Sequence, residues 1–357
     1  MLLLGATLTA FSVGVVTYGP TVLNPQSITV SADARASSGK WGEADWVLAN
    51  DGELIFLGGD IGHPSQSLPE ALREANVDPA AVKSIEFTTK TSANNISRAF
   101  VDLPELQKVL KLGNLNYSGS AESMFLSAAN LEEIDLDGFD TSKITTMEYM
   151  FLGIKASTLD VPKFDISNVT NMRGMFDGGS NLTSLDLSSF DTSKVVDMSY
   201  LFVGLSKITE LDVSSFNTSN VTNMRGMFDG VSNITSLDLS NFDTTKANDM
   251  NYMFLGAEKL EQLDISSFNT ASVKSMKNMF SSMKALEKLD LTSFIISENT
   301  NSQAMFSGTN NLKNLKLGLK SQLNTGMNLE NIPVMDGYTG KWQILTYGKA
   351  CQVVRWN

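Results

Sequence analysis

Hydrophobic residues recur along this chain with a period of 25 or 26 residues. An eleven-residue run from Asn168 to Gly178 returns unchanged from Asn220 to Gly230, two periods later. A fixed period of this length is typical of a solenoid, in which each unit buries its apolar face against its neighbours. Equivalent phenylalanines mark nine units: Phe100, Phe125, Phe151, Phe176, Phe202, Phe228, Phe254, Phe280 and Phe306.

The apolar spacing changes within each unit. Leu185 and Leu187 alternate with polar residues, which predicts a strand with one buried face. Met172, Met175 and Phe176 have the i, i+3, i+4 spacing of one helical face, and Gly178 follows where a left-handed cap favours glycine. The predicted fold is an α/β solenoid, a leucine-rich-repeat-like array of about nine units. Each unit is expected to hold a short strand and a short helical or 3-10 turn.

The array is expected to span residues 98–317, between a cap at 35–97 and a C-terminal cap, or the start of a truncated following module, at 318–357. In the first cap, two apolar segments flank Asp51-Gly52, which predicts a hairpin. Ser67 and Glu70 form a capping-box pattern and predict a helix to about Asn76. Val82 to Phe87 is the first expected strand.

Residues 1–34 are interpreted as a signal peptide. Leu2 to Val16 is apolar, and Ala32-Asp33-Ala34 is a small-x-small cleavage site. The basic residues that usually precede such a run are missing, since Arg35 is the first cation. A short N-terminal membrane anchor is the alternative, although the apolar run is short for a membrane span. No transmembrane domain is expected in the mature chain.

One long motif carries a family resemblance. Residues 181–193 read Asn-Leu-Thr-Ser-Leu-Asp-Leu-Ser-Ser-Phe-Asp-Thr-Ser, with Met-Phe-x-Gly ahead of them. This pattern resembles the BspA-like leucine-rich-repeat surface proteins of bacteria, from Arg98 to Leu317. The family's cysteine after Met-Phe-x-Gly is replaced here, as at Gly179 and Leu205. The resemblance implies a secreted or cell-surface protein with an adhesion role. The chain lacks the Leu-Pro-x-Thr-Gly sorting signal of wall-attached relatives, which puts the mode of attachment in question.

Composition argues against several classes of function. The net charge is -12, which disfavours nucleic acid and anionic membranes as partners and favours a basic partner or a cation. His63 and Cys351 are single, so the chain offers neither a His/Cys zinc set nor a disulfide. It also lacks a nucleophile elbow and a phosphate loop. No enzyme activity is predicted.

The candidate ligand surface is a column of acidic residues on the exposed side of the strands. Neighbouring strands lie about 4.8 Å apart, so equivalent side chains form a line. This line ends at Lys316, and Lys288 interrupts the neighbouring column. The candidate residues are Asp135, Asp160, Asp186, Asp212, Asp238, Asp264 and Asp290 in this line, together with Glu133 and Glu210 in the neighbouring column.

Two readings of the aspartate column stay open. If solvated carboxylates await a basic ligand or calcium, the one possible cofactor, mutual repulsion raises their pKa values. If neighbouring backbone N–H groups and hydroxyls bond them, their pKa values fall. The favoured function is an adhesin-like binding protein, extracellular or at the bacterial cell surface, whose partner is an extracellular or surface protein such as a host matrix protein. The alternative is a structural, self-associating surface-layer or scaffold component.

Overall fold

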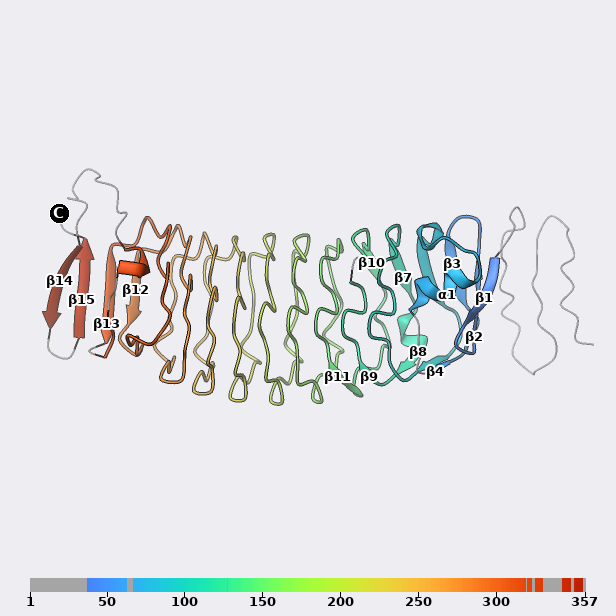
Figure 1. Cartoon of the computed structure of the whole chain (residues 1–357), viewed down its shortest axis with the longest axis horizontal. Coiled ribbons are helices and arrows are strands. Elements are labelled where there is room, and N and C mark those ends of the chain that lie inside the picture. The colour runs from blue at the N-terminus through green and yellow to red at the C-terminus, as the bar shows by residue number, and fades with distance from the viewer. Residues whose placement is uncertain are drawn as a thin grey trace, which may run out of the picture.

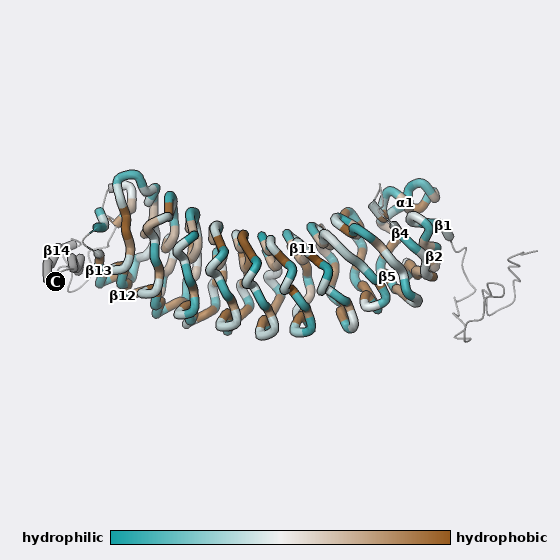
Figure 2. Tube along the Cα trace, turned by 90° about the horizontal axis from the view of Figure 1, so that it is seen from below, coloured by the Kyte–Doolittle hydropathy of each residue, from teal (hydrophilic) through white to brown (hydrophobic). Residues whose placement is uncertain are grey.

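The computed structural model describes residues 37–62, 67–126, 128–318, 320–322, 325–329, 342–347 and 350–355. The candidate signal peptide, His63 and residues 337–341 lie outside the described residues. The described chain is an elongated array of stacked turns, with most strands near its two ends (Figure 1). The array curves gently along its length (Figure 2). The solenoid that the sequence predicts is therefore confirmed.

The first sheet closes the N-terminal end. Its order is β1-β2-β3-β5-β7-β10, antiparallel from β1 to β3 and parallel from there on. The hairpin at Asp51-Gly52 forms as predicted, with Leu48 opposite Leu54 and Gly52 at φ +94°. The six strands are β1 (Ser37–Trp41), β2 (Ala44–Leu48), β3 (Glu53–Phe56), β5 (Ser84–Phe87), β7 (Lys108–Leu110) and β10 (Glu133–Ile134).

The predicted helix is also present. The helix α1 (Leu68–Glu74) begins after Ser67, whose backbone N–H donates to Glu70 Oε2 at 2.6 Å. Pro69 suits the first turn because its missing N–H has no helical partner there. The short 3-10 helices are η1 (Pro79–Ala81), η2 (Leu112–Asn114) and η3 (Thr325–Met327).

A second row of pairing runs along the opposite edge of the array in Figure 1. It continues beyond the strands as single parallel bridges, from Thr146–Asn171 to Ser275–Asn301. Its strands are β4 (Gly59–Gly62), β6 (Thr91–Ala93), β8 (Leu115–Tyr117), β9 (Gly119–Ser120) and β11 (Ile144–Thr146).

The helical turn predicted in each unit is wrong. From 147 to 287, a range described throughout, the structure has neither helix nor strand. Gly174 takes φ +56°, which ends any helix, and Tyr200 takes φ +60° at the same place in the next turn. The backbone N–H groups then point to the next turn, as in Gly174 N–H to Ser199 O at 2.8 Å and Phe176 N–H to Leu201 O at 3.2 Å. These bonds alternate with short bonds within the turn, such as Met175 N–H to Met172 O at 3.2 Å, so no helix extends.

The strand predicted at Leu185 to Leu187 is not formed, because this segment has no ladder of bonds to the neighbouring turns. Close to these leucines, one backbone bond joins the turn to its neighbour, from Thr183 N–H to Ser157 O at 3.1 Å. The alternation itself is confirmed, because Leu185 and Leu187 are buried and Asp186 is exposed. True strands form only where the end sheets supply further neighbours.

The core is a continuous stack of aromatic rings. The nine phenylalanines that mark the units are buried, with successive ring centroids 5.5 to 6.1 Å apart. Gly178 and its equivalents take φ values near +70°, as the cap pattern predicts. A second buried column follows the first by 13 or 14 residues, at Phe139, Phe164, Phe190, Phe216, Phe242, Phe268 and Phe294.

A four-stranded sheet covers the C-terminal end. β12 and β13 are parallel, β15 pairs antiparallel with β13, and β14 pairs antiparallel with β15. The strands are β12 (Lys288–Leu291), β13 (Asn314–Gly318), β14 (Trp342–Tyr347) and β15 (Ala350–Arg355). In the register, Cys351 lies opposite Leu317.

Candidate functional site

The acidic column lies in one row on the strand side of the array. Asp160, Asp186, Asp212, Asp238 and Asp264 are exposed. The two ends of the column, Asp135 and Asp290, are partly buried. The leucine, valine or isoleucine on either side of each exposed aspartate is buried in the core. The fold therefore holds one carboxylate per turn at the surface.

A local hydrogen bond fixes each of these carboxylates. Oδ1 of Asp186 accepts the backbone N–H of Ser188 at 3.0 Å, two residues on. This is an Asx-type turn, which short acidic side chains favour. The same bond measures 2.9 to 3.0 Å at Asp212, Asp238, Asp264 and Asp290.

Asp160 is the exception, and the sequence explains it. The residue two positions on is Pro162, which has no N–H to donate. Asp135 differs in another way, because its Oδ1 accepts Asp137 N–H and its Oδ2 accepts Lys111 N–H, both at 3.1 Å.

These bonds lower the carboxyl pKa values. The hydroxyl and N–H of Ser188 lower the pKa of Asp186, and Ser214 acts in the same way on the pKa of Asp212. The backbone N–H groups of Ser240 and Ser266, followed by their hydroxyls, lower the pKa of Asp238 and of Asp264. Burial is the largest influence on Asp290 and opposes the shift. Even so, Thr292 and Lys316 keep the pKa of Asp290 below its usual value. These five carboxylates are thus ionised at neutral pH.

Ion pairs neutralise the column at its two ends. Lys108 Nζ lies 2.7 Å from Glu133 Oε2, and Lys316 Nζ lies 3.1 Å from Asp290 Oδ2. Within the described chain, no salt bridge reaches the four central carboxylates. We call these four the central acidic stripe: Asp186, Asp212, Asp238 and Asp264.

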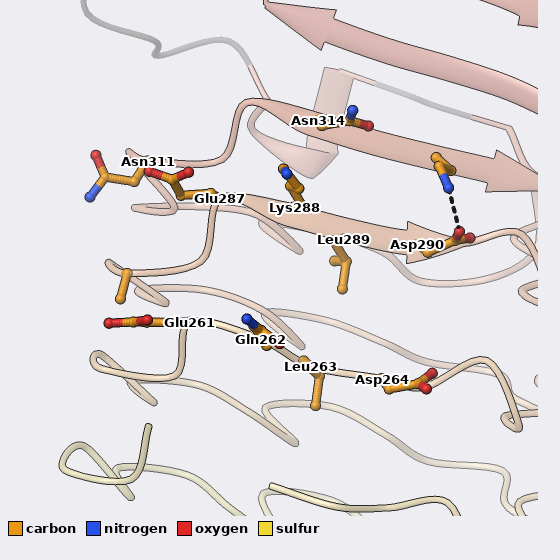
Figure 3. Close-up of a pocket in the computed structure, with 12 residues that line it drawn as sticks. Glu261, Gln262, Leu263, Asp264, Glu287, Lys288, Leu289, Asp290, Asn311 and Asn314 are labelled. Carbon is orange, nitrogen blue, oxygen red and sulfur yellow. Dashed lines mark hydrogen bonds and ion pairs between the residues drawn. The ribbon is translucent and has the colours of Figure 1, made fainter. Parts of the chain in front are cut away.

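A hollow of about 790 Å³ lies at the C-terminal end of the stripe (Figure 3). Glu261 and Glu287 lie at one end, and Asp264 and Asp290 at the other, with Leu263 and Leu289 between them. Lys313 pairs with Glu287 at 2.5 Å. The hollow is therefore lined by carboxylates, some of them already paired.

Sequence reasoning missed a second polar surface, on the other row of the array. Arg173 Nε donates to Tyr149 Oη at 2.7 Å, and its guanidinium carbon lies 5.5 Å from the ring centroids of both Tyr149 and Tyr200. Arg225 repeats this arrangement between Tyr200 and Tyr252, at 5.9 and 4.8 Å. We call these five residues the Tyr–Arg ladder. The signal for it was the eleven-residue run that returns after two turns.

Glycine is required where the ladder meets the backbone. A Cβ atom on Gly174 would collide with ring carbons Cδ1 and Cε1 of Tyr149, and one on Gly226 would lie 2.8 Å from Cδ1 of Tyr200. The order Arg-Gly in one turn and Tyr in the next is therefore a packing requirement.

Two further carboxylates stand beside the ladder. Asp177 and Asp229 are half-buried, and no described residue donates a hydrogen bond to either carboxylate. Burial raises the pKa of Asp177 to about 6. Burial, with a smaller contribution from Asp177, raises the pKa of Asp229 to about 6. The pKa values of these two carboxylates are raised, whereas those of the central acidic stripe are lowered.

Comparison with known proteins places the chain in a family. The family model described as "Mycoplasma protein of unknown function, DUF285" matches residues 119–211 and 206–318, which together cover more than half of the chain. The chain belongs to the DUF285 family. The matched residues of this DUF285 protein include the central acidic stripe and the Tyr–Arg ladder. No curated protein matches its sequence.

Two of the solved structures that resemble this DUF285 protein are of leucine-rich bacterial proteins. A leucine-rich repeat protein from Eubacterium ventriosum is 14% identical, with a TM-score of 0.42 over 79% of this chain and 84% of the other. A leucine-rich cell surface protein from Faecalibacterium prausnitzii is also 14% identical, with a TM-score of 0.27 over 82% and 96%.

The described residues hold neither a membrane-spanning helix nor a cluster of metal ligands. None of their helices has the length and apolar character needed to cross a membrane. No three carboxylate, imidazole or thiol side chains among them come together as a set of metal ligands.

Proposed function

We propose that this chain is a secreted or cell-surface binding protein that recognises a basic segment of another extracellular protein, such as a host matrix protein. The candidate surface is the acidic column from Glu133 to Asp290, with the central acidic stripe as its main part. One observation carries the proposal: four carboxylates in successive turns are exposed, ionised and free of ion pairs within the described chain.

Electrostatics supports a basic partner. Like charges about 4.8 Å apart repel by roughly 1 kcal/mol in water, and by more near a protein surface. Each Asx-type bond stabilises its own carboxylate and leaves the stripe's net charge in place. A partner that brings lysine or arginine to the stripe would remove this repulsion. Complementary charge of this kind mainly speeds association and fixes specificity.

The BspA-like resemblance and the apolar run at Leu2 to Val16 support an exported location. Mass spectrometry of medium and cell fractions tests it. Export predicts a mature chain that begins near Arg35, and an intact Met1 on a cytoplasmic protein would contradict it.

The binding test compares two fourfold variants in capture of purified matrix and bacterial surface proteins. In the first variant, Asp186, Asp212, Asp238 and Asp264 become Asn. The control changes four other exposed aspartates with the same turn bond and the same loss of charge: Asp140, Asp165, Asp191 and Asp243. We expect the first variant to lose capture and the control to keep it. Equal capture by both would refute the stripe as the binding surface.

A further inference from the structure

The residues of the Tyr–Arg ladder repeat every two turns, and this two-turn period is found on the surface and not in the core. The core needs one phenylalanine per turn, and the central acidic stripe has one aspartate per turn. On the ladder face, Arg173-Gly174 and Arg225-Gly226 occupy alternate turns, and tyrosine stands in the turns between. Asp177 and Asp229 alternate in the same way. Stacking alone does not explain why both a cation and an anion return every second turn.

This face has the composition of a protein interface. Tyrosine and arginine are enriched at binding hot spots, where they contribute large, partly apolar contacts. Leu152, Val203 and Leu255 hold the position of Asp177 in neighbouring turns, and all three are partly exposed. Val196, four residues before Tyr200, is 43% exposed and is the one large hydrophobic side chain that the described residues leave exposed.

Contacts with the tyrosine rings fix the side chains of Arg173 and Arg225 while leaving them accessible. Arg173 Nε bonds Tyr149 Oη, while its closest carboxylate, Glu148, lies 3.8 Å away. The corresponding carboxylate for Arg225 is Asp249, at 3.5 Å. Both arginine side chains remain more than one third exposed, at 40% and 34%. A side chain fixed by stacking loses little conformational entropy on binding.

We propose that this face binds the same face of a second copy of the chain, with the two arrays side by side and parallel. A twofold axis along the arrays would put Arg173 of each copy opposite Asp177 of the other, and Arg225 opposite Asp229. The half-buried carboxylates then receive the donors that the described residues of one chain do not supply. Such an interface is self-complementary, as a twofold dimer requires.

The order of charges selects the parallel arrangement. An antiparallel pair centred on Tyr200 would put Arg173 opposite Arg225 and Asp177 opposite Asp229, so that like charges meet. In the parallel pair, both copies have the same pitch of about 4.8 Å per turn, and contacts two turns apart stay in register. The ladder spans about 20 Å over five turns. This length fits the small end of the range of protein interfaces, and we expect a weak, concentration-dependent dimer.

Sedimentation equilibrium of the full chain, from about 1 to 300 µM, tests the pairing. We expect a monomer–dimer equilibrium that R173Q/R225Q and the near-isosteric D177N/D229N each weaken at least tenfold. The control K194Q/K246Q removes two exposed cations that bond only Asn168 and Asn220, and it should dimerise like the wild type. A wild-type chain that stays monomeric would overturn the proposal. So would a dimer that neither ladder variant weakens.

Charge reversal gives the sharper test. R173D/R225D and D177R/D229R should each be monomeric alone, because like charges face each other. Mixed in equal amounts, they should form a heterodimer, since every facing pair is again of opposite charge. Circular dichroism confirms that each variant is folded. Two folded variants that fail to pair on mixing would refute the arrangement. Loss of dimerisation leaves the central acidic stripe intact, so this test and the binding test fail independently.

Discussion

Thr192 and Asn217 exchange two hydrogen bonds across neighbouring turns. Thr192 Oγ1 donates to Asn217 O at 3.0 Å and accepts Asn217 N–H at 2.8 Å. The same exchange joins Thr218 to Asp243 and Thr244 to Asn269. All three threonines are buried, so their hydroxyls satisfy backbone groups that water does not reach. These paired bonds tie successive turns together where the structure has no strand.

Thr218→Val should therefore destabilise the array. Valine has nearly the same shape but leaves the N–H and C=O of Asp243 unpaired, at a cost of about 1 to 3 kcal/mol. Urea denaturation measures the loss. Thr183→Val is the matched control, because the Thr183 hydroxyl is exposed. Equal losses at both positions would show that the exchange across turns contributes little.

Phenylalanine in the core should matter more at the centre than at the end. Phe228 stacks between Phe202 and Phe254, each at 5.7 Å, whereas Phe306 stacks on Phe280 at 5.8 Å. Phe228→Ala should cost about 3 to 5 kcal/mol. Phe306→Ala should cost less, because an end unit has fewer neighbours. Thermal and urea unfolding compare the two, and identical losses would contradict a coupled stack.

Gly174→Ala should disturb the Tyr–Arg ladder. The left-handed backbone costs a residue with a Cβ about 1 to 2 kcal/mol, and the Cβ would also displace the Tyr149 ring. Tyr149→Ala combined with Gly174→Ala removes the collision and leaves the backbone cost. A double-mutant cycle should therefore show that the second change partly rescues the first. Strict additivity would argue against the contact.

Stability should pass through a maximum as the pH falls. In the folded protein, burial raises the pKa values of Asp177 and Asp229 to about 6, above their values in the unfolded chain. The cost of ionising them is full above pH 6 and disappears toward pH 4, so the folded state gains stability over that range. The carboxylates of the central acidic stripe have lowered pKa values. Their contribution is lost as the pH falls from about 4 through those lower values.

The melting temperature, measured as a function of pH, tests both the predicted rise and the predicted fall in stability. The protein is kept dilute, so that the chain is monomeric. D177N/D229N should remove the rise between pH 7 and pH 5. The fourfold Asn variant of the stripe should flatten the fall at lower pH. A profile that D177N/D229N leaves unchanged would contradict the cost assigned to these two carboxylates.

The parts of the fold that depend on local rules could be predicted from the sequence. The phenylalanine columns, the glycines near φ +70° and the Ser67–Glu70 capping box each follow from residue type and spacing. The helical turn could not, because Met172, Met175 and Phe176 also fit a chain that bonds the next turn. Only the left-handed φ at Gly174 and Tyr200 separates the two structures.

Part of the candidate site could likewise be predicted from the sequence, and part could not. The outward aspartates follow from alternation, and their turn bonds follow from a donor two residues on, which Pro162 removes at Asp160. The Tyr–Arg ladder depends on contacts between residues about 25 positions apart. The repeated run contains the two arginines but none of the three tyrosines, so the stacking is visible only when the turns are placed next to each other.

Single Asp→Asn changes along the acidic column test the binding proposal most directly. The affinity of the captured partner for each variant is measured by calorimetry, from Asp135 to Asp290. The account predicts the largest losses at Asp212 and Asp238, at the centre of the stripe. It predicts the smallest loss at Asp290, whose carboxylate is already paired with Lys316. A flat profile, or one that peaks at the paired end, would contradict recognition by the central acidic stripe.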